Sequence, residues 1–109
     1  MDLEKIQQVL EKSKPEIQTL LFSPEIGEFL QKLSETNGLD EEMSAKMTDE
    51  VGLIILGLKE RLTLKSSLVT VGIPEKTVDQ IVQEISREIF SELDKIENIP
   101  KNPQLKDLK

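Results

Sequence analysis

The chain has 109 residues with 14 basic and 21 acidic side chains, which gives a formal net charge of −7 at pH 7. It contains neither cysteine nor histidine, which excludes a disulfide framework, a thiolate zinc site and the commonest metal ligand. A field of this sign repels phosphate backbones and anionic lipid headgroups, so it disfavours nucleic-acid binding, and we expect no membrane partner.

The apolar residues of the N-terminal half recur at the three- and four-residue spacing of amphipathic helices. A first helix is predicted from Leu3 to near Lys14, and a second from Pro15, since proline suits the first turn of a helix. Ser23-Pro24-Glu25 predicts the start of a third helix, with the serine hydroxyl as its N-cap. Asn37-Gly38 predicts where that helix ends.

Asp40 predicts the N-cap of a fourth helix, whose segment from Val51 to Leu58 is apolar on all sides. A helix of that kind is usually buried all round, so we place it at the centre of the fold. A buried strand is the alternative, but the acidic helical lead-in favours helix, and Gly57 is expected to bend or end it. A surplus of apolar surface here also favours self-association. The candidate core and self-association residues are Val51, Ile54, Ile55 and Leu58.

The C-terminal half predicts two more helices. Apolar residues from Leu58 to Val71 indicate a weaker one that Gly72 closes, and Ile73-Pro74-Glu75 begins the longest one, which ends before Pro100. The prediction is an all-α fold, a compact bundle of five to six helices over residues 1–97. Residues 98–109 are expected to form a disordered polar, proline-containing tail or linker.

The chain shows no signal that directs it to a membrane or to secretion. No apolar run approaches the roughly 20 residues of a membrane-spanning helix. The start, Met1-Asp2-Leu3-Glu4, lacks the basic and apolar regions of a secretory signal. We therefore expect a cytoplasmic protein.

No arrangement of catalytic side chains emerges from the sequence. Ser66 and Ser67 have no histidine to activate them. The acidic residues around Asp40 lack the ligand spacing and central glycine of an EF-hand loop. We expect no enzyme activity, no cofactor and no metal site.

The last predicted helix carries glutamates at one-turn intervals, namely Glu84, Glu88 and Glu92. Like charges at this spacing weaken a helix by a few tenths of a kcal/mol. A plain solvated face is one interpretation, and a surface for a basic partner is the other. We take these three as the candidate partner-facing residues of a protein-interaction or assembly module.

Two other functions stay open at this point. Gly72-Ile73-Pro74-Glu75 joins two helices as in a helix-turn-helix, which would indicate a regulatory nucleic-acid-associated protein, although the acidic balance of the second helix argues against phosphate contact. A carrier could instead hold an apolar ligand beside Phe29, Met43 and Met47. Methionine-lined interiors are more often simple core.

Four motifs between Gly38 and Leu93 also carry a resemblance. They are the acidic helix start Asp40-Glu41-Glu42, the apolar segment 51–58, the Gly-Ile-x-Glu start at 72–75, and Ile85-Ser86-Arg87-Glu88-Ile89-Phe90. Together they resemble a small helical domain of unassigned function found in proteins of candidate-phyla-radiation bacteria. The resemblance covers about half of the chain. It implies a helical accessory or interaction domain and carries no catalytic residues.

Overall fold

A computed structural model of the chain describes residues 3–97, and the side chains of residues 4–96. Within these residues every regular element is a helix, which confirms the predicted all-α fold. The predicted tail, residues 98–109, lies outside the described residues. In chain order the elements are α1 (Leu3–Lys12), α2 (Pro15–Leu21), α3 (Pro24–Thr36), α4 (Glu41–Ile55), α5 (Thr63–Thr70), α6 (Glu75–Ile85), η1 (Ser86–Phe90) and α7 (Ser91–Glu97).

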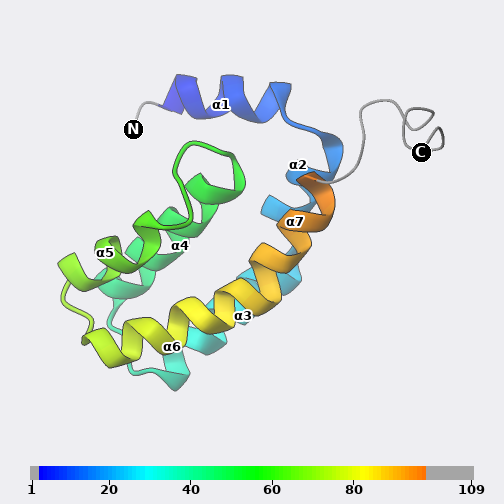
Figure 1. Cartoon of the computed structure of the whole chain (residues 1–109). Coiled ribbons are helices and arrows are strands. Elements are labelled where there is room, and N and C mark those ends of the chain that lie inside the picture. The colour runs from blue at the N-terminus through cyan, green and yellow to red at the C-terminus, as the bar shows by residue number, and fades with distance from the viewer. Residues whose placement is uncertain (1–2, 98–109) are drawn as a thin grey trace.

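The helices pack around one core (Figure 1). The 51–58 segment buries Val51, Ile54 and Ile55 in this core, but Leu53 and Leu56 are only half-buried. The prediction that this segment is buried on all sides is therefore wrong. α4 packs against α2, α3 and α5, while α5 packs against α6, and α2 against α7. α6, η1 and α7 follow one another without a break and form one long rod (Figure 1). The predicted long last helix is therefore confirmed. Its middle turn, η1, is a π-helix, which the spacing of apolar residues does not predict.

The core is built from the apolar stripes of the helices, as their spacing predicts. The central apolar segment contributes Val51, Ile54 and Ile55, and Leu58 beyond it is half-buried. Partly buried side chains surround the core, among them Phe29 and Met43. The buried apolar residues are Leu20, Leu30, Leu33, Met47, Val51, Ile54, Ile55, Leu64, Leu68, Ile73, Val78, Ile81, Ile85, Ile89, Phe90 and Leu93.

The ends of the helices follow local chemistry with two exceptions. Pro15 and Pro24 stand at the first positions of α2 and α3, as predicted. Ser23 occupies the N-cap position of α3, but its hydroxyl makes no capping hydrogen bond, so the predicted serine cap is wrong. The predicted helix from Leu58 is also wrong in its start, because α5 begins only at Thr63.

Gly57 explains where the fourth helix ends. Its φ is +78°, a left-handed conformation that glycine adopts without strain. The backbone N–H of Leu58 then donates to the Leu53 carbonyl at 2.9 Å, which closes the end of α4 in the manner of a Schellman motif. The chain therefore leaves the helix after Ile55, and residues 56–62 form a loop.

The Asp40 cap offers a first test of this local chemistry. The Met43 backbone N–H donates to Asp40 Oδ1 at 2.8 Å, so the carboxylate satisfies one free donor at the start of α4. We expect Asp40→Ala to lower the free energy of unfolding by about 1 kcal/mol in urea denaturation. Asp40→Asn, which keeps the acceptor, should cost much less. An equal loss in both variants would show that the charge, and not the hydrogen bond, stabilises α4.

Candidate partner-binding groove

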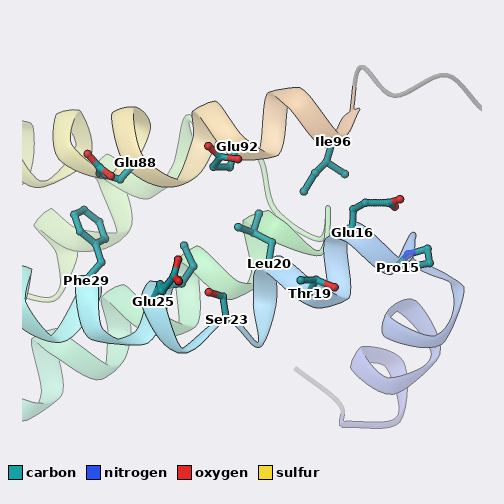
Figure 2. Close-up of a pocket in the computed structure, with 11 residues that line it drawn as sticks. Pro15, Glu16, Thr19, Leu20, Ser23, Glu25, Phe29, Glu88, Glu92 and Ile96 are labelled. Atoms are coloured by element: carbon teal, nitrogen blue, oxygen red, sulfur yellow. The ribbon is translucent and has the colours of Figure 1, made fainter.

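A groove runs between α2 and α3 on one side and the rod of η1 and α7 on the other (Figure 2). Its volume is about 690 Å³. The floor is apolar and consists of Leu20 from α2, Ile26 and Phe29 from α3, and Ile96 from α7. Leu20 is buried and the other three are half-buried. The groove therefore leaves core-facing apolar side chains partly open to solvent.

Both rims of the groove are acidic. Glu88 and Glu92 extend from the rod, and Glu16 and Glu25 come from the opposite wall, α2 and α3 (Figure 2). Among the described residues that line the groove, none is a lysine or an arginine. Four carboxylates around an apolar floor create a negative potential that the low-dielectric walls concentrate.

The contact between α2 and α7 positions the groove. Lys14 reinforces this packing, because its Nζ donates to the Ile96 carbonyl at 3.3 Å. This hydrogen bond joins the residue before α2 to the last turn of α7. The two walls of the groove are thereby held together at one end, although they come from opposite ends of the described chain.

Glu84, the third candidate partner-facing residue, lies in an adjoining hollow. Phe29 lines both this hollow and the groove, so the two meet at its ring. Arg87 donates to both carboxylate oxygens of Glu84 at 2.6 Å. The structure therefore brings Glu84, Glu88 and Glu92 along one side of the rod, but only the last two line the groove itself.

The π turn helps to keep these glutamates in a row. Residues four apart in an α-helix are rotated by about 400°, so such a row drifts by about 40° at each step. A π turn contains more residues, so the drift across Ser86–Phe90 is smaller. Glu88 lies inside this turn, and its carboxylate stays on the side of the rod that faces α3.

The cations next to the rim are held weakly. Lys95 lies 3.1 Å from Glu92, and Arg87 Nε lies 4.0 Å from Glu88. These side chains are more than half exposed, and such surface pairs contribute about 0–1 kcal/mol each. A partner's cation could therefore replace either one at little energetic cost.

Sequence reasoning missed the second rim. Glu16 and Glu25 each follow a proline at the first position of a helix, and the sequence pattern indicates Glu25 only as part of a helix start. That repeated Pro-Glu motif is the one local signal available. Nothing in it indicates that the two carboxylates face Glu88 and Glu92, because this depends on the packing of α2 against α7.

The other candidate residues lie in the interior or in separate places. Met47 is fully buried, and Phe29 lines the groove. The Met43 methyl lies beside Gly72, 3.6 Å from where a Cβ would stand if this residue had a side chain. Because Val51, Ile54 and Ile55 are buried within one chain, self-association through them would require the core to open.

The turn considered as a helix-turn-helix faces acidic neighbours. Lys65 Nζ lies 2.9 Å from Asp79 and 3.4 Å from Glu75. The hydrogen bond and charge of Asp79, together with Glu75, raise the pKa of Lys65. This cation of α5 is thus already engaged by two acids of α6, an arrangement that disfavours phosphate binding.

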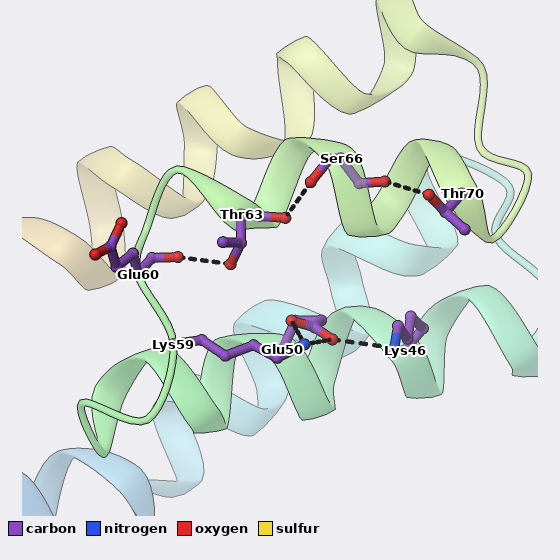
Figure 3. Close-up of polar contacts among 7 residues, drawn as sticks. All are labelled: Lys46, Glu50, Lys59, Glu60, Thr63, Ser66 and Thr70. Carbon is purple, nitrogen blue, oxygen red and sulfur yellow. Dashed lines mark hydrogen bonds and ion pairs between the residues drawn. The ribbon is translucent and has the colours of Figure 1, made fainter.

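An ion cluster around the buried carboxylate of Glu50 holds the loop after α4 (Figure 3). The side chain of Glu50 is 1% exposed, and Lys59 donates to its two oxygens at 2.7 and 2.9 Å, while Lys46 lies 3.0 Å away. Burial by itself raises the pKa of Glu50, but the hydrogen bonds and charges of Lys59 and Lys46 outweigh it and lower the pKa below its usual value. This cluster anchors the loop, and both lysines engage the Glu50 carboxylate.

Two hydroxyls of α5 are bonded to the helix backbone. Ser66 Oγ donates to the Thr63 carbonyl at 3.0 Å, and Thr70 Oγ1 donates to the Ser66 carbonyl at 2.7 Å (Figure 3). Hydroxyls bonded in this way satisfy local backbone acceptors. Ser66 thus donates its hydroxyl hydrogen to the backbone of its own helix.

A second hollow lies between α1, the end of α2 and α4. Ile6, Phe22 and Leu53 are among its lining residues, and Phe22 is strongly exposed. Its two lysines, Lys46 and Lys59, are both bound to Glu50. Asp49 lines the hollow as well, so its two lysines and two acids balance, in contrast to the uniformly acidic rims of the groove.

Comparisons with protein-family models, with curated proteins and with solved structures find no match to this chain. The resemblance to a small bacterial helical domain therefore stays a prediction. Among residues 3–97 no helix is long and apolar enough to cross a membrane. The same residues contain no group of three or more acidic side chains placed to hold a metal ion.

Proposed function

We propose that this domain is a protein-interaction module whose groove between α2–α3 and η1–α7 binds a basic, partly apolar segment of another protein. One observation carries the proposal: an apolar floor left half open between two acidic rims, with no basic residue among its described lining residues. Such a surface complements a chain that presents apolar and cationic side chains together.

The two parts of the groove would contribute differently to binding. Apolar side chains that cover Ile26, Phe29 and Ile96 would gain about 25 cal/mol for each Å² removed from water. Lysine or arginine stems can lie along the same floor while their charged ends reach the rim carboxylates. The charges mainly raise the association rate and select the partner. A groove of this size fits a weak or transient complex.

Neutralising the rim tests this proposal. The probe is a short fluorescein-labelled peptide of lysine and leucine at helical spacing, and the measurement is fluorescence anisotropy. We expect Glu88→Gln with Glu92→Gln to weaken binding about ten-fold, since two charge pairs of up to about 1 kcal/mol each are lost. Binding by the unchanged chain should fall as salt is added.

The matched control is Glu41→Gln with Glu42→Gln, which changes the net charge by the same amount at an exposed site on α4. This pair should leave the affinity nearly unchanged. If both pairs weaken binding equally, the peptide responds only to the overall negative charge and the groove is not its site. A glutamate–leucine peptide should not bind.

A further inference from the structure

The sequence directly after the described helices has the chemistry that the groove selects. Residues 101–109 contain Lys101, Lys106 and Lys109 against one acid, Asp107, and two leucines three residues apart. This segment is thus basic and partly apolar within a chain of net charge −7. The groove offers the complementary surface, an apolar floor between acidic rims.

The last described helix ends beside the groove. Ile96 lines one end of it, and α7 ends at Glu97. Glu92 and Glu88 lie about 6 and 12 Å back along the rod from Ile96, at about 1.5 Å per residue. An extended chain covers about 3.3–3.6 Å per residue. Lys101, five residues after Ile96, can therefore reach either carboxylate.

We propose that residues 101–109 bind in the groove of their own chain and compete there with the basic segment of a partner. This inference rests on the proposed function of the groove. Tethering gives such a segment a local concentration in the millimolar range, so even a weak contact is populated. The segment would then set the affinity that a partner needs in order to bind.

The absence of cysteine from the chain allows a direct test. A nitroxide label on the single variant Gln104→Cys broadens the amide signals of nearby residues in an NMR spectrum of the full chain. We expect broadening at Thr19, Ser23 and Phe29, which line the groove, and not at Ser66 or Thr70 on α5, which lies away from it (Figure 1). Added salt should reduce the broadening.

Two measurements can overturn the proposal. Equal broadening on α5, or none at the groove, would show that the segment does not bind there. A second sample mixes nitroxide-labelled chain without ¹⁵N with ¹⁵N-enriched chain without nitroxide. Broadening in this sample reports contacts between copies. Broadening of the groove in that mixture as strong as within one chain would make a second copy the occupant.

Competition with the lysine–leucine peptide connects this inference to binding. Leu105→Ser with Leu108→Ser leaves the net charge unchanged and removes the apolar contacts of the segment. We expect this variant to bind the peptide about two- to five-fold more tightly, because the apparent affinity scales with the fraction of open grooves. Unchanged affinity would contradict competition. If the groove signals broaden but the peptide does not bind, the proposed function is wrong, whereas the binding of residues 101–109 in the groove still stands.

Discussion

Replacing Lys46 and Lys59 together by methionine should lower the free energy of unfolding at neutral pH by about 3–5 kcal/mol. Both ammonium groups contact the Glu50 carboxylate, within 3.0 Å, and that side chain is 1% exposed. Without them a charge stays buried with no partner. The loss is a large part of the roughly 5–15 kcal/mol that stabilises a domain. Urea denaturation followed by circular dichroism measures it.

The double substitution should reverse the sign of the contribution that Glu50 makes to the pH dependence of stability. In the native chain the pKa of Glu50 is lowered, despite burial, by the hydrogen bonds of Lys59 and Lys46. Its stabilising contribution is therefore present above the unfolded pKa of about 4.3 and is lost as the pH falls through the lower folded value. In the double variant burial alone acts and raises the pKa, so acidification should relieve the destabilisation.

A third substitution separates the buried charge from the loss of lysine contacts. Adding Glu50→Met to the double variant makes all three positions apolar, and such replacements are often neutral or stabilising. We expect the triple variant to recover most of the lost free energy. If it stays as unstable as the double variant, the lysine side chains stabilise the loop through packing and not through Glu50.

The helix boundaries that the sequence predicts well depend on short-range chemistry. Pro24 fixes its own φ and suits the first turn, Asp40 reaches an N–H three residues ahead, and Gly57 adopts a positive φ. Each signal acts within a few residues. The start of α5 was missed because Lys59 engages Glu50 across the loop, and this contact is invisible to helical periodicity.

The candidate groove likewise has one rim that short-range spacing in the sequence predicts and one rim that it does not. Glu88 and Glu92 are visible as a row because residues four apart share a helix face. The facing rim, Glu16 and Glu25, depends on how α2 and α3 pack against the rod, and no local spacing encodes that arrangement. The ion pairs of Glu50 are not visible in the sequence either. A glutamate beside an apolar segment is usually solvated, and only the fold brings two lysines to it.

Two leucines six residues apart in the chain, Leu62 and Leu68, should respond very differently to the same substitution. Leu68 on α5 is 0% exposed, and this helix packs against α4 and α6. We expect Leu68→Ala to lower the free energy of unfolding by about 2–5 kcal/mol, because lost burial and an unfilled cavity add together. Leu62, just before α5, is 87% exposed, and Leu62→Ala should change stability by no more than about 0.5 kcal/mol.

The pair is well matched, because both changes remove the same atoms and neither residue lines the groove. Urea denaturation gives the two differences in unfolding free energy, and peptide anisotropy in native buffer should be unchanged for Leu62→Ala. A large loss at Leu62 would mean that residues 58–62 continue α5 inward, as the apolar spacing predicted. Equal tolerance at both positions would contradict the packing of α5 between α4 and α6. The contrast therefore tests where the loop ends and the core begins.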